Sequence, residues 1–411
     1  MKRFFILITI LGALSTTAVA QKRVINDVKR TLSSLNLSVT SYKGAMSKLT
    51  PALKHQETAN KAETWELAGK IQMGMYDKYV DAMRVGQKVD TVAMGKSLID
   101  AYDYYDKAMR LDTIHEIDHD GLVKVDRRTG HAKFRTKYSK NILRALADHL
   151  DDYKTVGGDL YNVKSWDKAH RAWEIYCILA QRLKGTKQQV SDQQVGEIRY
   201  YQGIALWQQG DNASAARTFA KAMQLGFHDK EVYDYALICL SNAGDEGGIV
   251  KIAGEAFKRF GTTDPQYIRI LINDLINRKS YDQANRLLDT AIGANDHDAE
   301  LQNLKGLVVE QQEGIEAALP YYERCVELNP NDDRGLFNVG RYYYNEAMAE
   351  ADRNSRMSMR VLRERVNPLF KKALPYIEKS YQLNPENKEA RDALRNIYYR
   401  LGQGNKLQSL E

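Results

Sequence analysis

Apolar residues recur along this chain at intervals of three and four, the spacing that places side chains on one face of an α-helix. In the second half of the chain, three segments carry such a series: Ile268, Leu271 and Leu275; Leu301, Leu304 and Val308; Leu336, Val339, Gly340 and Tyr343. No run of alternating apolar residues is long enough to predict a sheet. The pattern predicts a chain built from amphipathic helices.

A second pattern follows each of these segments. A small residue is followed four positions on by a large one and three further on by another small one, at Ala284, Leu288 and Ala291, at Ala318, Tyr322 and Cys325, and at Ala373, Ile377 and Ser380. Small residues on one helix face let a neighbouring helix approach closely. Ala284 and Ala318 are 34 residues apart, and Ala318 and Ala373 are 55 apart, which is 34 plus a 21-residue insertion. This spacing predicts repeated pairs of helices.

The chain also repeats itself literally. Residues 318–330 return as residues 373–385 with eight of 13 positions identical, and a looser third copy covers residues 101–112. The small–large–small pattern continues towards the N-terminus at Ala215, Phe219 and Ala222, at Ala169, Trp173 and Tyr176, and at Ala45, Leu49 and Ala52. Between them, Val250, Gly254 and Phe257 occupy the same positions with the sizes inverted, which predicts a distorted repeat. Self-similarity at this period indicates a stacked repeat array.

Two segments resemble a known repeat. Leu336, Val339, Gly340 and Tyr343 have the spacing of the first helix of the tetratricopeptide (TPR) repeat, and Trp65, Ala68 and Gly69 resemble its W-x₂-L-G core. Over nearly all of its mature length the chain resembles the TPR family. The resemblance implies an all-α, superhelical solenoid of about eight antiparallel helix pairs, closed by a C-terminal capping helix. Solenoids of this kind usually bind partners along an extended surface and seldom carry a catalytic centre.

The sequence also predicts how the chain is divided. The expected segments are a signal peptide at 1–20, N-terminal TPR units with an extended helical hairpin at 21–112, a linker or hairpin loop at 113–140, a TPR array at 141–388 with a helical insertion near 349–367, and a capping helix with a tail at 389–411. Four Asp-Pro or Asn-Pro pairs, in which a capping side chain precedes a proline suited to the first helical position, predict helix starts at Pro265, Pro330, Pro368 and Pro385.

The N-terminus has the order of a secretory signal peptide. Met1-Lys2-Arg3 is followed by an apolar stretch from Phe4 to Leu14 and by Ala18-Val19-Ala20 before Gln21. Eleven apolar residues are few for a membrane span, which needs about 20. We expect cleavage after Ala20, with an uncleaved anchor as the alternative. No cysteine follows the cleavage site, so a lipid-anchored terminus is not expected, and no later stretch predicts a transmembrane segment. The expected location is the periplasm of a Gram-negative cell envelope.

Composition excludes several classes of function. After loss of Lys2 and Arg3, 58 basic against 53 acidic residues leave a net charge of +5, which is too mild to predict a nucleic-acid-binding protein. Three scattered cysteines, Cys177, Cys239 and Cys325, fall in helix patterns without a C-x-x-C motif. We expect them to be buried small side chains and not disulfide or metal ligands.

No catalytic, metal or cofactor site is predicted. Histidines and acidic residues gather near residues 115–131, and Glu116, Asp118 and Asp120 before Gly121 imitate the start of an EF-hand loop. The position of the closing glutamate holds Arg127, which would repel calcium. The sequence contains no Gly-rich phosphate loop, no G-x-S-x-G and no H-E-x-x-H.

The 21-residue insertion is strongly basic. Residues 352–372 contain seven basic and two acidic residues, a net charge equal to that of the whole mature chain. The analysis predicts that the preceding helix runs on from Leu336 towards Val366 and aligns four arginines on one face: Arg353, Arg356, Arg360 and Arg363. This basic arm is either a solvated helix face or a surface for an acidic partner or anionic lipid headgroups.

The TPR resemblance also implies a binding groove lined by the first helices of successive repeats. Its candidate residues are Arg269, Asn273, Asn277, Asn303, Arg334, Asn338, Arg341 and Tyr344. In one subset of the family, cations and asparagines in this groove grip a C-terminal carboxylate. Arg269 and Asn273 match the first pair, with Arg in place of the usual Lys. Asn303 matches the second Asn if its helix is shifted by one residue, and Arg334 matches a later cation, whereas Asn338 stands where another cation is expected.

Two functions are therefore expected from the sequence. The first is an exported TPR scaffold that binds a protein or peptide in the cell envelope. The alternative is a structural subunit of an outer-membrane or carbohydrate-uptake assembly, in which the basic arm makes the main contact. An enzyme is the third hypothesis, and no nucleophile, base or metal set supports it.

Overall fold

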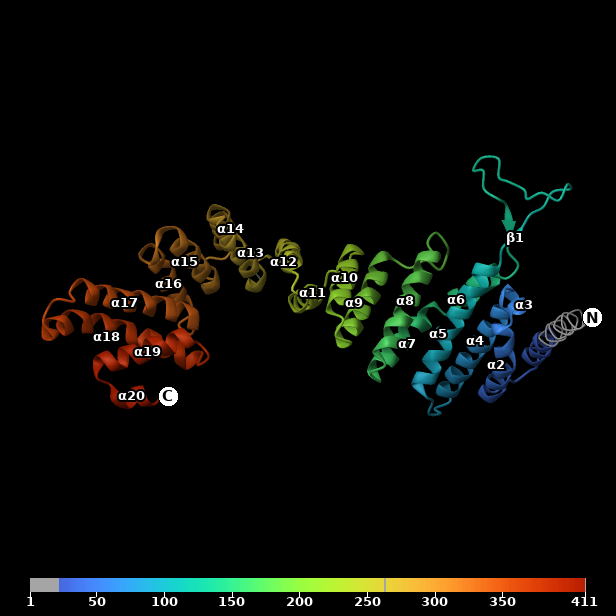
Figure 1. Ribbon diagram of the computed structural model, residues 1–411, viewed down its shortest axis with the longest axis horizontal. Coiled ribbons are helices and arrows are strands. Elements are labelled where there is room, and N and C mark those ends of the chain that lie inside the picture. Colours follow the sequence, from blue (N-terminus) through green and yellow to red (C-terminus); the bar gives the residue numbers. More distant parts are fainter. Residues whose placement is uncertain (1–21, 262–263, 411) are drawn as a thin grey trace, which may run out of the picture. The chain divides into compact units, whose positions relative to one another are not determined.

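The computed structural model describes residues 22–261 and 264–410, and the predicted signal peptide lies outside these ranges. The chain divides into two compact units, with unit 1 ending at Gly244 and unit 2 beginning at Asp245. Figure 1 shows that helices follow one another along almost the whole described chain. The sequence analysis placed no boundary after Gly244.

Both units are built from helices. Unit 1 contains α2 (Val39–Lys54), α3 (Gln56–Ala59), α4 (Ala62–Arg84), α5 (Thr91–Leu111), β1 (Ile114–His115), β2 (Phe134–Arg135), α6 (Ser139–Asp148), α7 (Leu150–Asn162), α8 (Trp166–Arg182), α9 (Asp192–Gln208), α10 (Asn212–Gln224) and α11 (Lys230–Ala243). Unit 2 contains α12 (Glu246–Phe260), α13 (Pro265–Asn277), α14 (Tyr281–Ala294), α15 (Ala299–Glu313), α16 (Ile315–Leu328), α17 (Asp333–Arg353), α18 (Met359–Leu383), α19 (Lys388–Leu401) and α20 (Gly404–Gln408).

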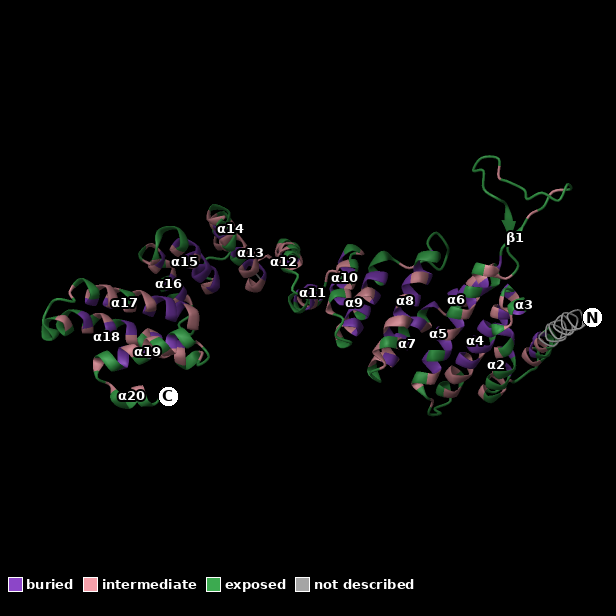
Figure 2. Ribbon diagram, in the orientation of Figure 1, coloured by how far each residue is buried: buried purple, intermediate pink, exposed green. Residues whose placement is uncertain are grey.

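Consecutive helices pack as pairs, and each pair packs on the next. The most extensive contacts join α4 with α5, α9 with α10, α15 with α16, and α17 with α18. Figure 2 shows buried residues along the faces where neighbouring helices meet and exposed residues on the outer faces. The predicted all-α array of helix pairs is confirmed, and α19 is the expected closing helix against α17 and α18.

Glycines on first helices allow the pairs to pack closely. Gly203 and Gly306 each precede, by 16 residues, the fully buried ring of Phe219 or Tyr322 on the second helix. A Cβ atom on either glycine would lie 2.5 Å from that ring, closer than real contacts allow. Gly157 meets Trp173 at the same separation. The large residue of the small–large–small pattern therefore packs against glycine backbone.

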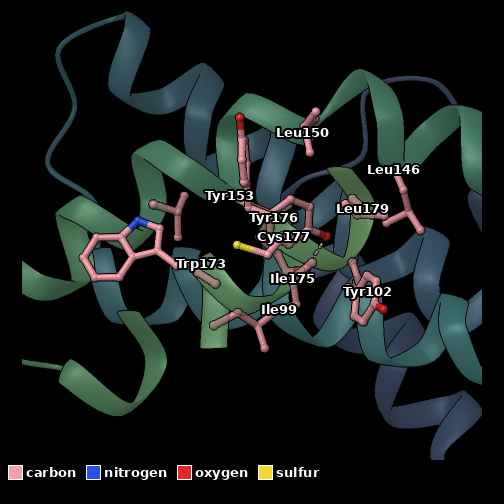
Figure 3. Packing of buried hydrophobic residues seen from close by; sticks show 14 of the residues in the cluster. Ile99, Tyr102, Leu146, Leu150, Tyr153, Trp173, Ile175, Tyr176, Cys177 and Leu179 are labelled. Atoms are coloured by element: carbon pink, nitrogen blue, oxygen red, sulfur yellow. Dashed lines mark hydrogen bonds between the residues drawn. The ribbon is translucent and has the colours of Figure 1, made fainter. Parts of the chain in front are cut away.

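The core of unit 1 is rich in aromatic residues. Figure 3 shows part of it, with Tyr153, Tyr176 and Cys177 among the labelled side chains that pack together. All three cysteines are buried and unbonded, as expected. Burial raises the pKa of the Cys177 and Cys239 thiols to about 11, so both are protonated at neutral pH. The inverted positions of the predicted distorted repeat, Val250, Gly254 and Phe257, fall on α12 and are only half-buried.

The predicted helix starts are correct at only one of four positions. Pro265 begins α13 after the cap Asp264. Pro330 and Pro385 instead lie in turns, and the helices after them are capped by Asp332 and Asn387. Pro368 lies inside α18. The buried stripe of Val366, Phe370, Ala373 and Ile377 continues through it, so packing of this face overrides the local preference of proline to begin a helix.

The segment predicted as a linker or hairpin loop folds into a short β-hairpin. Ile114 pairs with Arg135 and His115 with Phe134 in an antiparallel ladder, which projects from the helices in Figure 1. The buried Asp112 carboxylate accepts hydrogen bonds from the backbone of residues 137–139 and closes the base of the hairpin. These bonds outweigh the effect of burial and lower the pKa of Asp112. Within the described residues, no group of three or more His, Cys, Asp or Glu side chains could hold a metal ion.

Candidate functional site

The predicted groove residues lie on α13, α15 and α17, and the two arginines of the predicted clamp converge. Arg334 Nη1 donates to Glu300 Oε1 at 3.0 Å, and its Nη2 donates to Oε2. Arg269 Nη1 lies 3.7 Å from Glu300 Oε1. The Glu300 side chain is only 10% exposed. The anion between these arginines is therefore a carboxylate of the chain itself.

A second internal network occupies the next part of the groove. Arg341 donates to both carboxylate oxygens of Glu310, at 2.8 and 2.6 Å, and Tyr322 donates to Glu310 Oε2 at 2.6 Å. Burial raises the pKa of Glu310, but the hydrogen bonds from Arg341 and Tyr322 outweigh it, and the net pKa is lowered. Asn338 donates to Asn303 at 3.0 Å and accepts from Arg341.

The remaining groove candidates do not join these networks. Asn273 and Asn277 are exposed on α13. Tyr344 accepts a hydrogen bond from Asn396 of α19 at 2.9 Å, and its ring lies beside Phe370. The expected convergence of Arg269, Asn273, Asn303 and Arg334 on one ligand carboxylate is thus not what the structure shows. Binding of a partner in this groove stays a prediction, because a ligand anion would have to displace Glu300.

The basic arm differs from the prediction in shape. The helix from Leu336 does not run on to Val366, because α17 ends at Arg353 and α18 begins at Met359. The Asn354 side chain donates to the carbonyl of Glu350 at 2.9 Å, which ends α17 and begins the turn. The insertion is therefore the tip of a helical hairpin whose two arms are both lengthened.

This hairpin distributes the four arginines over three elements. Arg353 ends α17 and pairs with Glu350 at 3.3 Å, and Arg356 is exposed in the turn. Arg360 and Arg363 lie on α18, where Arg360 Nε donates to Glu364 at 3.1 Å. Arg363 has a different neighbourhood from the other three, because it lines a cavity.

The cavity of about 800 Å³ lies between the first turns of α18 and the second half of α19. Three exposed arginines line it: Arg363, Arg395 and Arg400. Its apolar lining consists of Met359, Leu362, Val366, Phe370 and Tyr399. Asp392 is the one carboxylate among the lining residues. Across residues 264–410, no carboxylate forms an ion pair with any of the three arginines.

A smaller cavity of about 390 Å³ adjoins it between α17 and α19, and the two share Asp392 and Asn396. Arg341 and Tyr344 line the smaller cavity, so it connects the predicted groove with the arginine-lined cavity. Arg341 Nε is buried there without a hydrogen-bond partner among the described residues. The sequence analysis identified Arg363 but missed Arg395 and Arg400. Their spacing on the polar face of the closing helix was the available signal.

The described part of the chain contains no helix long and apolar enough to cross a membrane. A comparison with curated proteins gave no match. Residues 271–346, which cover parts of α13 and α17 and all of α14–α16, match the sequence model of the tetratricopeptide repeat. This match supports the TPR relationship directly for the region that contains the predicted groove.

Several solved TPR structures are similar to the chain at low sequence identity. YrrB, described as a TPR protein with an unusual peptide-binding site, is 18% identical, with a TM-score of 0.31 over 48% of this chain and 90% of YrrB. PilF of Pseudomonas aeruginosa is 14% identical, with a TM-score of 0.39 over 53% and 90%. The C-terminal part of a TPR protein from Cytophaga hutchinsonii is 17% identical, with a TM-score of 0.40 over 62% and 93%.

Proposed function

We propose that this protein is an exported, non-catalytic scaffold of the bacterial cell envelope, and that unit 2 binds an acidic segment of a protein partner. The observation that supports this proposal is the cavity between α18 and α19, in which three arginines without carboxylate partners surround an apolar floor. Arginine residues without an internal partner are available to a ligand at no cost of breaking an existing ion pair. The groove arginines Arg269, Arg334 and Arg341 lack this property, because each already contacts a glutamate.

The chemistry of the cavity favours a segment that is both acidic and apolar. A guanidinium group can donate two parallel hydrogen bonds to a carboxylate, and each charged hydrogen bond contributes on the order of 1.5–3 kcal/mol. Phe370 and Tyr399 offer apolar area beside the arginines, which a glutamate-rich segment with aliphatic side chains would bury. The concave shape favours a protein segment over a flat membrane surface, which would first meet the exposed arginines at the hairpin tip.

Export is part of this proposal and rests on the N-terminal sequence pattern. We expect the protein isolated from the envelope to begin at Gln21, because the charged, apolar and small-residue regions of a signal peptide are all present. Intact-mass analysis measures this directly. A chain that retains Met1 would contradict the proposal and support the membrane-anchored alternative.

The triple variant R363Q/R395Q/R400Q is expected to bind an acidic partner at least tenfold more weakly than the wild type. The probe is a blocked peptide of alternating Glu and Leu residues, measured by isothermal titration calorimetry. Loss of one charged hydrogen bond corresponds to roughly tenfold in affinity. The melting temperature should hardly change, because exposed charges contribute little to stability.

The matched control R353Q/R356Q/R360Q removes the same charge from the hairpin tip, outside the cavity. It should retain affinity within about threefold, since only long-range attraction is lost. Equal losses in both variants would reduce the basic arm to a general charge effect. Binding of phosphatidylglycerol vesicles without binding of the peptide would replace the proposed partner with a membrane.

A further inference from the structure

Unit 1 contains a line of aromatic rings that the proposed function does not use. Tyr161 of α7 lies 6.2 Å from Trp173 of α8 between ring centroids, and Trp173 lies 5.8 Å from Tyr201 of α9. Tyr200 continues the line, 5.5 Å from Tyr201 and 5.1 Å from Phe227. The rings come from three helices and the loop before α11, and they form the walls of two neighbouring cavities.

The first cavity, of about 430 Å³, is mainly apolar and preformed. Tyr161, Trp173 and Tyr201 line it. Trp173 is fixed, because its Nε1 donates to the carbonyl of Lys154 at 3.1 Å and its ring is 96% buried, with a relative exposure of 4%. Gly158 opens the floor, since a Cβ atom built there meets no atom within 4 Å. This cavity can take an apolar side chain without rearrangement of its walls.

The second cavity, of about 740 Å³, combines aromatic rings with negative charge. Tyr200, Tyr201 and Phe227 line it together with Glu197, Asp229 and Glu231, and its lining contains no Lys, Arg or His. Glu197 already contacts Lys154 at 3.2 Å and the Tyr201 hydroxyl at 3.3 Å. Asp229 and Glu231 form no ion pair within residues 22–261. Two carboxylates therefore face this cavity without a balancing cation.

Tyr201 is the wall that both cavities share. A ligand that passes this ring would place successive groups in an apolar site and an anionic site. Cations bind well over aromatic faces, and a nearby carboxylate strengthens the attraction. The order of these sites therefore specifies the order of groups on the ligand.

We propose that unit 1 binds an extended peptide segment, with an aliphatic side chain in the cavity beside Trp173 and a lysine or arginine side chain between Tyr200 and the carboxylates of Asp229 and Glu231. A neutral sugar would satisfy the aromatic walls but would leave both carboxylates unbalanced, so the charge favours a cationic peptide. This site has the opposite charge preference to the cavity of unit 2, and it does not depend on that proposal.

The test uses calorimetry with the full-length mature protein and blocked Ser-rich peptides that carry one Leu and one Lys, separated by zero, one or two residues. We expect at least one spacing to bind, and replacement of its Lys by Gln or of its Leu by Ser to weaken binding at least tenfold. D229N/E231Q should produce the same loss for the Lys peptide and little further loss for the Gln peptide. G158L should fill the first cavity and abolish the preference for Leu over Ser.

Two further measurements keep the outcomes distinct. If G158L fails to fold, as circular dichroism would show, D229N/E231Q still tests the anionic site, because it changes only exposed charges. R363Q/R395Q/R400Q should leave binding of the Lys peptide unchanged, which separates this site from the one in unit 2. Failure of every spacing to bind, equal binding of the Lys and Gln peptides, or binding of a neutral oligosaccharide in their place would overturn the proposal.

Discussion

Replacing Gly306 by alanine is expected to destabilise unit 2 by about 1–3 kcal/mol, a typical cost of adding a methyl group to a packed interface. The new Cβ would lie 2.5 Å from the ring of Tyr322. That ring cannot simply move aside, because it is fully buried and its hydroxyl donates to Glu310, which Arg341 holds in turn. For a unit of this size, each kcal/mol lowers the melting temperature by roughly 2–4 °C.

Gly293 provides the matched control on the neighbouring helix α14. It is exposed, and a Cβ atom there meets nothing within 4 Å. G293A should stabilise the helix slightly, by up to about 1 kcal/mol, because alanine loses less backbone entropy than glycine. Thermal unfolding followed by circular dichroism measures both variants. Equal melting temperatures for G306A and G293A would contradict the close contact between glycine and ring that we describe for each pair.

Truncation after Asn387, which removes α19 and α20, is expected to expose the end of the array and cause aggregation. Leu394 and Ile397 of α19 are essentially fully buried, and burial of two such side chains contributes about 3–6 kcal/mol. Their loss would also uncover the apolar residues of α17 and α18 that pack against them. Terminal helices with a polar outer face are what keep repeat arrays soluble.

A shorter truncation after Gln403 is the control. It removes α20, which has no buried residue, and one ion pair between Lys406 and Glu378 in which the Lys406 side chain is 55% exposed. Exposed ion pairs contribute little, so this variant should remain monomeric and folded. Size-exclusion chromatography with light scattering distinguishes the two truncations. A monomeric, fully folded chain without α19 would show that this helix does not close the array.

The spacing of apolar residues was sufficient to predict the helix pairs. Ala318, Tyr322 and Cys325 are all fully buried, as their offsets of four and three require. Such offsets depend only on the geometry of a single helix, and repetition along the chain removes most of the ambiguity of one match. The same local information failed at Pro368, where burial of a continuous helix face outweighs the preference of proline for a helix start.

The partners of the groove arginines could not be predicted in this way. Glu300 lies 31 residues after Arg269 and 34 before Arg334, and it meets both only because successive repeats stack. Nothing local marks this glutamate as an internal anion. The arginine-lined cavity was equally hidden, because it requires α18 to begin nine residues before Pro368 and so to reach Arg395 and Arg400 on α19.

Photo-crosslinking inside the cell tests most directly the central claim that unit 2 binds a protein partner at the cavity between α18 and α19. The crosslinker p-benzoylphenylalanine replaces Tyr399, which is 75% exposed and lines the cavity, or Glu327 of α16, whose side chain is 65% exposed and lines neither cavity of unit 2. The account predicts discrete protein adducts from position 399, none from position 327, and loss of the adducts in the R363Q/R395Q/R400Q background. The same adducts from both positions, or none from position 399, would contradict it.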